Sequence, residues 1–193
     1  MENDFWAMQI RIAMSEQTDI IKQTISILCI DSPLGNILAG AAEQGICLLE
    51  FREQNNLDMS STSRQLNANI EEGDSVHFAS LIKQLNEYFE GRRKIFDVPL
   101  LMLGTAFQQE VWQQLLTIPY GSTRSYKEQS MTLNKVDAIR AVAGANGANR
   151  IAILIPCHRV IGGDGSLTGY AGGLWRKKWL LDLEQGQLTM PSR

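Results

Sequence analysis

The sequence predicts an α/β protein in which a β-rich first half is followed by a helical second half. From residue 24, apolar and polar side chains alternate, and turn residues separate the alternating runs, as in half-buried strands. Residues 76–90 place their apolar side chains on one helical stripe. Beyond residue 104 the pattern becomes helical, with helix-capping signals at two points. These observations divide the chain into two structural parts.

The first strand is expected at 24–30, where Ile25, Ile27 and Cys29 alternate with their neighbours. Turn chemistry at 32–35 and at 43–45 separates this strand from two others. Three strands joined by short turns predict an antiparallel meander. The residues before the first strand lack a clean period and are expected to form a loosely docked extension. The two further strands are expected at 36–42 and 46–52.

Residues 53–74 are polar and acidic, which predicts a loop or a short helix. In the helix at 76–90, Gly91 supplies the stop. Residues 94–103 can form either a last strand or an extended linker, and the domain boundary is placed near Gly104. The expected division is an extension at 1–23, a first domain at 24–103, a second domain at 104–186 and a tail at 187–193.

Two capping boxes predict helix starts in the second half, with Thr105 and Ser125 as the capping residues. Asn134 and Asp137 are expected to cap a third helix that runs to about Asn146. Short helices separated by a tight turn indicate a helix-turn-helix. The segment around residue 157 is expected to be a buried turn, and residues 175–184 a closing helix.

Composition sets limits on the class of protein. The chain has 193 residues, 44% of them hydrophobic and 20% charged, which is ordinary for a globular protein. No apolar run is long enough for a membrane span, and the N-terminus does not look like a signal peptide. The three cysteines suggest no disulfide framework and fit the reducing cytoplasm, where we expect the protein.

Charge is unevenly distributed along the chain. The net charge is −3, which argues weakly against a nucleic-acid partner. Residues 1–103 hold 8 Lys and Arg against 15 Asp and Glu, whereas residues 104–184 hold 9 against 6. A DNA-facing surface is therefore expected in the second half.

Cys157 lies in the run Ile-Pro-Cys-His-Arg-Val at 155–160. A thiol is a nucleophile only as thiolate, and a neighbouring base can bring its pKa toward neutrality. Pro156 stiffens the turn that presents the sulfur, and His158 is adjacent. The alternative is a buried cysteine that packs as a small hydrophobe.

The segments around this run resemble the O6-alkylguanine-DNA alkyltransferases, also called methylated-DNA–protein-cysteine methyltransferases. The order and spacing of the matching motifs fit that family from about residue 24 to 186. The motifs are Gly-Thr-Ala-Phe-Gln-Gln-Glu-Val-Trp at 104–112, Ile-Pro-Tyr-Gly at 118–121, Ser-Tyr at 125–126, Arg-Ala-Val at 140–142, Asn149, Gly-Tyr-Ala-Gly-Gly at 169–173, and Arg-Lys at 176–177 through Trp-Leu-Leu at 179–181 to Glu184.

The resemblance implies a ribonuclease-H-like first domain and a helical second domain that binds DNA through a helix-turn-helix. It implies a single-use DNA repair reaction that moves the alkyl group of O6-alkylguanine, and more weakly of O4-alkylthymine, to Cys157. The implied partner is damaged double-stranded DNA, bound through the minor groove with the base flipped out. We expect a monomer with no cofactor, no bound metal and no membrane partner.

Four catalytic roles follow from the resemblance. Cys157 is the acceptor, His158 the base that takes the thiol proton through an ordered water, and Glu184 the carboxylate that orients the imidazole. Tyr126 is the donor to guanine N3 as the base departs. Taken singly, each of the last three has a structural alternative: a core histidine, a solvated charge and a packed tyrosine.

The resemblance also assigns DNA contacts. Arg140 is the finger that fills the place of the flipped base, and Ser125 is a second contact. Ala138, Ala141 and Gly144 are small enough for the helix backbone to approach the groove walls. The alternatives are a surface ion pair for the arginine and tight helix packing for the small residues.

The remaining expected site residues shape the substrate pocket. The resemblance implies that Asn149 is a hinge between turns and that the carbonyl of Val160 recognises the guanine amino group. The pocket wall is formed by Tyr170, Ala171 and Gly172.

Three departures from the family pattern bear on this pocket and on DNA docking. Arg150 replaces a usual proline, Gln129 a common apolar residue, and Ala152 an occasional proline. They predict a roomier pocket and a less certain helix-turn-helix docking.

Two rival functions remain open from sequence. A lesion-binding module would recognise alkylated DNA without transfer, as proteins that lack the acceptor cysteine do. A cysteine hydrolase would use Cys-His-Glu geometry with an oxyanion hole and turn over an ester or amide.

Overall fold

The computed structural model describes residues 23–52, 63–64 and 67–188. Residues 1–22 of the expected extension and most of the expected tail lie outside these residues, while Gln23 belongs to the first strand. The first half forms a four-stranded sheet of order β3-β2-β1-β4, from β1 (Gln23–Ile30), β2 (Ile37–Ala42), β3 (Gly45–Phe51) and β4 (Ala68–Glu72). β1, β2 and β3 pair antiparallel, so the predicted meander is confirmed.

β4 differs from the prediction of a loop or short helix over residues 53–74. This strand pairs parallel to β1 at the edge of the sheet. Only Ala68 and Ile70 are apolar in it, so it carries too little alternation to be recognised. The prediction for Cys29 is also wrong: this residue is exposed, while Ile30 is buried in the main core. At this end of β1 the buried face is the one that packs on the main core.

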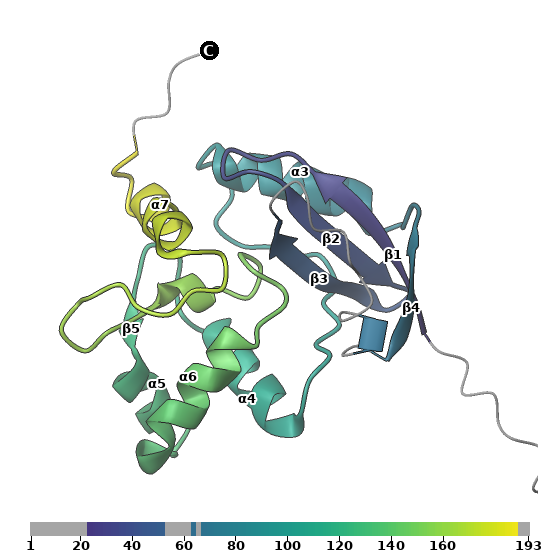
Figure 1. Ribbon diagram of the computed structural model, residues 1–193. Coiled ribbons are helices and arrows are strands. Elements are labelled where there is room, and N and C mark those ends of the chain that lie inside the picture. The colour runs from purple at the N-terminus through teal and green to yellow at the C-terminus, as the bar shows by residue number, and fades with distance from the viewer. Residues whose placement is uncertain (1–22, 53–62, 65–66, 189–193) are drawn as a thin grey trace, which may run out of the picture.

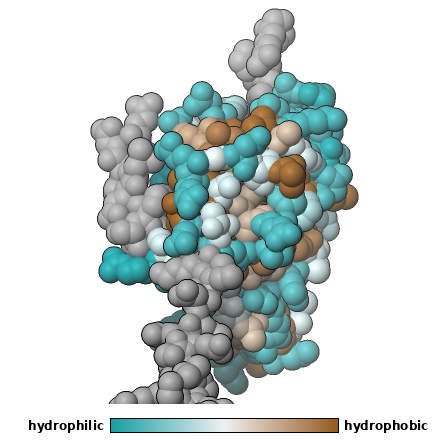
Figure 2. Space-filling model, turned by 90° about the vertical axis from the view of Figure 1, so that its right-hand side faces the viewer, coloured by the Kyte–Doolittle hydropathy of each residue, from teal (hydrophilic) through white to brown (hydrophobic). Residues whose placement is uncertain are grey.

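α3 (Phe78–Phe89) packs on one face of the sheet (Figure 1). Its buried stripe includes Phe78, Leu81 and Leu85, as predicted, and the chain turns at Gly91 with φ of +71°. The opposite sheet face packs a smaller cluster that includes Ile25 and Leu48. On the side of β4, hydrophilic residues surround scattered hydrophobic ones (Figure 2).

The second half is helical. Its helices are α4 (Ala106–Leu115), α5 (Tyr126–Thr132), α6 (Ile139–Gly147) and α7 (Leu174–Glu184), with short 3₁₀ turns η1 (Val136–Ala138) and η2 (Cys157–Arg159). Both predicted capping boxes are present at Thr105 and Ser125. The predicted caps at Asn134 and Asp137 are wrong. A 3₁₀ turn precedes α6, and neither residue caps it; Asn134 instead adopts φ of +55°.

The outer edge of β3 binds two extended segments, and the second of them belongs to the second half. Ile46 bonds to the extended segment 94–103 through Pro99 O and Leu101 N, at 2.9 and 2.8 Å. This segment forms only an isolated bridge, so the extended-linker alternative holds. Farther along, Leu49 N donates to Arg150 O and Leu49 O accepts from Ala152 N, at 2.7 and 2.9 Å. The main hydrophobic core runs through both halves without interruption.

A second pair of strands forms inside the helical half. β5 (Arg124–Ser125) and β6 (Val160–Ile161) pair parallel, which brings the start of α5 beside the segment that follows Cys157. Among the described residues, no helix is both long and apolar enough to cross a membrane.

Candidate active site

Cys157 begins η2 and is half-buried. Asn149 holds this turn in place, because its Nδ2 donates to Ile155 O at 2.9 Å and to the Cys157 Sγ at 3.2 Å. Its Oδ1 accepts from Ile151 N at 3.0 Å. One amide therefore ties the exit of α6 to the turn that presents the sulfur, which is the geometry expected of the hinge.

His158 and Glu184 form a buried pair. The His158 Nε2 lies 2.9 Å from the Glu184 Oε1, and both side chains are fully inaccessible. The His158 Nδ1 is buried and has no hydrogen-bond partner among the described residues. In a neutral imidazole whose Nε2 donates, Nδ1 is the lone-pair nitrogen. The ring is therefore oriented to accept a proton at Nδ1.

Besides His158, three groups donate hydrogen bonds to the Glu184 carboxylate. The Arg159 Nε and Nη2 donate to its two oxygens at 2.8 and 2.9 Å, and Gly121 N donates at 3.0 Å. Tyr88, from α3, donates its hydroxyl at 2.8 Å. Burial alone would raise the pKa of Glu184, but the hydrogen bonds from His158 and Arg159 and the positive charge of the Arg159 guanidinium hold it well below its usual range.

The surroundings of the Cys157 thiol act on its pKa in opposite directions. Burial raises the pKa of the Cys157 thiol, while the Asn149 amide and the charge of Lys177 act in the lowering direction without overcoming burial. Burial also lowers the pKa of His158, so the imidazole is neutral. This differs from the expectation that neighbours bring the thiol pKa toward neutrality. Desolvation of the anion is the larger effect, so the proton has to be taken by a base.

Tyr126 starts α5 directly after the Ser125 cap. Its hydroxyl donates to Thr168 O at 3.2 Å and lies 3.4 Å from Gly169 O. Burial raises the pKa of Tyr126, and the nearby Cys157 acts in the same direction, so the phenol keeps its proton. A phenol in this state can donate to a base that enters beside the sulfur.

The expected pocket residues lie on two segments. Val160 is buried in β6, and its carbonyl accepts from Lys177 Nζ at 2.6 Å. Tyr170, Ala171 and Gly172 form the loop before α7, and the Tyr170 hydroxyl is buried without a partner among the described residues. A β-carbon on Gly172 would lie 2.6 Å from the Phe51 ring, so this wall packs directly on the first half.

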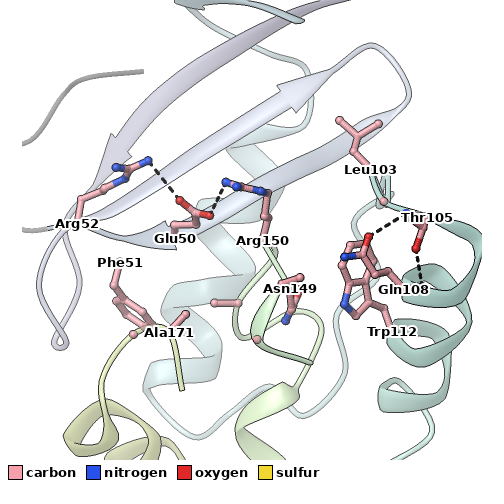
Figure 3. A pocket seen from close by; sticks show the side chains of 15 residues that line it. Glu50, Phe51, Arg52, Leu103, Thr105, Gln108, Trp112, Asn149, Arg150 and Ala171 are labelled. Carbon is pink, nitrogen blue, oxygen red and sulfur yellow. Dashed lines mark hydrogen bonds and ion pairs between the residues drawn. The ribbon is translucent and has the colours of Figure 1, made fainter. Parts of the chain in front are cut away.

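A cleft of about 820 Å³ opens between the two halves beside this wall (Figure 3). Glu50 lies between Arg52 and Arg150 at its upper side, with an ion pair of 3.0 Å to Arg150. Asn149, Ala171 and Gly172, three of the expected pocket residues, also line this cleft. Ala152, one of the noted departures, also lines it.

The expected DNA contacts lie on α6 and at the start of α5. Arg140 is exposed and makes no hydrogen bond or ion pair within the described residues. Ala141 and Gly144 are exposed on the same helix, and a β-carbon on Gly144 would meet no other part of the described fold within 4 Å. Ala138 is partly buried before α6, and the Ser125 hydroxyl is engaged in the capping box.

Gln129 explains how α5 docks on α6. Its side-chain amide pairs reciprocally with that of Asn146, at 2.7 and 3.2 Å, and both side chains are buried. The polar residue at this position therefore replaces apolar packing with two hydrogen bonds. Its effect on how the helix-turn-helix docks on DNA stays a prediction.

Sequence reasoning missed three residues that complete the site: Arg159, Tyr88 and Lys177. Arg159 lies within the run at 155–160, but its type alone assigns it no role. Tyr88 lies on the buried stripe of α3, seven residues after Leu81, and this spacing was the available signal. Lys177 stands in an Arg-Lys pair, and no local signal shows that it is buried. Among the described residues, no group of three His, Cys, Asp or Glu side chains could hold a metal ion, and the absence of a metal stays a prediction.

Two family models match the chain. Residues 26–102 match the ribonuclease-like domain of 6-O-methylguanine DNA methyltransferase, and residues 106–186 match its DNA binding domain. A methylated-DNA–protein-cysteine methyltransferase of Methanosarcina barkeri is 45% identical over 159 residues, which cover 82% of this chain and 96% of the relative. The constitutive enzyme of that name from Bacillus subtilis is 40% identical over 156 residues, covering 80% and 92%.

Solved structures give the same result. The crystal structure of Mycobacterium tuberculosis O6-methylguanine methyltransferase aligns with a TM-score of 0.73 and 44% identity, covering 86% of this chain and 95% of that one. A crystal structure of Mycobacterium tuberculosis OGT in complex with DNA aligns with a TM-score of 0.71 and 43% identity, covering 85% and 94%.

Proposed function

Because the chain belongs to the 6-O-methylguanine DNA methyltransferase family, we propose that Cys157 accepts the alkyl group from guanine O6. The protein is a methylated-DNA–protein-cysteine methyltransferase that repairs DNA by direct alkyl transfer. The observation that carries the assignment of the acceptor is the buried His158–Glu184 pair beside a cysteine whose sulfur is held by Asn149.

The reaction follows from the protonation states of these groups. The sulfur attacks the alkyl carbon as its proton passes to the Nδ1 of His158 through a water, and the bond from carbon to O6 breaks. Tyr126 gives its proton to guanine N3, so the base leaves neutral, and the imidazolium or solvent restores the phenol. Glu184 stabilises the imidazolium as it forms. The product is a thioether, which no group in the site displaces, so each molecule acts once.

DNA binding is supported by the family and by the structure of the relative with DNA. In our proposal α6 enters the minor groove, its small exposed residues let the backbone approach, and Arg140 takes the place of the flipped nucleotide. α5 and α6 lie at the end of the molecule away from the sheet, where a duplex can reach them (Figure 1). We further propose that the protein acts as a monomer in the cytoplasm and accepts O4-alkylthymine more weakly.

The test is an intact-protein mass measurement after mixing with duplex DNA that carries O6-methylguanine. We expect one methyl group per chain, located on Cys157 by peptide mapping, and none on Cys157→Ala. Cys29→Ala is the matched control, because Cys29 is an exposed thiol in the sheet, and it should react like the wild type.

Repeated turnover, or methyl found on another residue, would contradict the proposal. Tight binding to the lesion without a mass gain would favour the lesion-binding alternative. Hydrolysis of an ester or amide independent of DNA would favour the hydrolase.

A further inference from the structure

Lys177 is a fully buried lysine in the first turn of α7. Its Nζ donates to Val160 O and to Thr168 O, both at 2.6 Å, and lies 3.5 Å from Gly169 O. It forms no ion pair with a carboxylate among the described residues. A buried ammonium without a counter-ion is costly unless dipoles surround it, and here three carbonyls do so. One cation thus joins β6 to the loop that precedes the pocket wall.

The same loop carbonyls are the acceptors of Tyr126. The Tyr126 hydroxyl bonds to Thr168 O and Gly169 O at 3.2 and 3.4 Å, longer than the 2.6 Å bond that Lys177 makes to Thr168 O. The Lys177 Nζ lies 5.9 Å from the centre of the Tyr126 ring. A charge-assisted donor forms the stronger bond to a shared acceptor. The tyrosine hydroxyl is therefore held weakly and can turn to another acceptor while the carbonyls stay paired.

We propose that Lys177 is a positioning residue for alkyl transfer. It keeps the loop carbonyls paired while Tyr126 turns to the departing base, and its charge stabilises the negative charge that develops on sulfur and, until Tyr126 gives up its proton, on guanine. This inference rests on the proposed function of Cys157 and Tyr126. No bond to Lys177 forms or breaks in the reaction, and its effect is exerted through hydrogen bonds and charge.

The titration of Lys177 predicts a pH dependence of the transfer rate. Burial lowers its pKa to about 8, partly opposed by the nearby Cys157. The ionisable groups that face it are Tyr126, Cys157 and His158. Tyr126 stays protonated and His158 stays neutral in this range, because burial raises the pKa of the first and lowers that of the second. The ammonium is charged below its pKa and lost above it, so the transfer rate should fall as pH rises above about 8.

The experiment compares single-turnover methyl transfer by wild type, Lys177→Met, Lys177→Arg and Lys178→Met across neutral and alkaline pH. The probe is duplex DNA carrying O6-methylguanine. Lys178 is the matched control, because it is the neighbouring lysine but is exposed and pairs with Asp182 on the outside of α7. We expect Lys177→Met to lose about tenfold or more in rate, with DNA affinity within about twofold of wild type, since charge stabilisation acts on the transition state.

Three further readouts separate positioning from folding. Lys177→Met should lack the alkaline decline, and Lys177→Arg, which keeps its charge, should recover rate and also lack the decline. The double variant Tyr126→Phe/Lys177→Met should lose less transfer rate than the product of the two single fold-losses. The reason is that both residues act on the same step, the proton donation from Tyr126 to guanine N3. If Lys177→Met does not fold, the inference is tested by two other measurements. The transfer rate of the wild type should fall at alkaline pH, and that of Lys177→Arg should not.

A Lys177→Met protein with the rate and pH profile of wild type would overturn the inference, as would fully additive effects with Tyr126→Phe. Transfer to Cys157 by the wild type is measured first by mass. If the wild type transfers nothing, the proposed function fails. If it transfers and the Lys177 variants match it, only this inference fails.

Discussion

At the scale of single residues, Glu184 joins chemistry and folding. It accepts hydrogen bonds from four groups, of which one is the histidine that we assign as base and another is the buried guanidinium of Arg159. A substitution at Glu184 therefore removes an orienting partner and at the same time leaves a buried cation without its counter-charge.

We predict that Glu184→Gln lowers the single-turnover transfer rate by about 10²-fold or more, because the imidazolium loses its stabilising charge. The free energy of unfolding should fall by about 3–5 kcal/mol, since Arg159 is left uncompensated. Urea denaturation and quenched-flow transfer measure the two effects. Asp182→Asn is the control on the same helix, where the carboxylate pairs with an exposed lysine. Wild-type rate and stability in Glu184→Gln would refute the assignment.

At the scale of elements, α5 and α6 contact each other through buried polar side chains. A buried pair of amides, Gln129 and Asn146, takes the place of apolar packing. Each amide supplies the hydrogen-bond partner that the other needs, so the intact pair has little net effect on the free energy of unfolding. Removing either member leaves the other buried without its partner.

We predict that Gln129→Leu and Asn146→Leu each lower the free energy of unfolding by about 1–3 kcal/mol, because each leaves a buried amide unpaired. The double variant should be less destabilised than the sum of the two, since no orphaned polar group remains. Urea denaturation of all four proteins completes the cycle. Strict additivity would show that the two amides do not depend on each other.

At the scale of the whole molecule, the first half supports the site in the second. Tyr88 from α3 reaches Glu184, Phe51 from β3 packs on the pocket wall, and Arg150 of the second half pairs with Glu50 of the first at one side of the cleft. The two halves also share one core. The site is therefore a property of the complete described fold.

The pH dependence of stability belongs to this scale. The folded-state pKa values of Glu184 and His158 both lie below their ordinary values. As pH falls, the unfolded chain therefore takes up protons at these two groups before the folded chain does. What the two groups contribute to the free energy of unfolding is fully present near neutrality. The His158 part is lost as pH drops below about 6.5, and the Glu184 part as pH drops below about 4.3. We predict that the urea midpoint falls through this range. Glu184→Gln should flatten the lower part, and an unchanged slope in that variant would contradict the prediction.

Local patterns predicted the local structure well. The meander, α3 and both capping boxes follow from periodicity and from side chains a few residues apart. β4 could not be predicted, because its pairing with β1 is a long-range contact and its own sequence is mostly polar. The catalytic candidates came from the resemblance. Tyr88 and Lys177 were missed, because their roles depend on partners that are distant in sequence.

The covered edge of β3 has a consequence for the fate of the molecule. An open strand edge can recruit a strand from another chain and start aggregation. Here segments 99–101 and 150–152 occupy part of that edge, while the opposite edge, β4, ends in the exposed acidic residues Glu71 and Glu72. If each molecule is used once, as we propose, every repaired lesion leaves a spent copy, and these two protected edges disfavour the growth of such copies into fibrils.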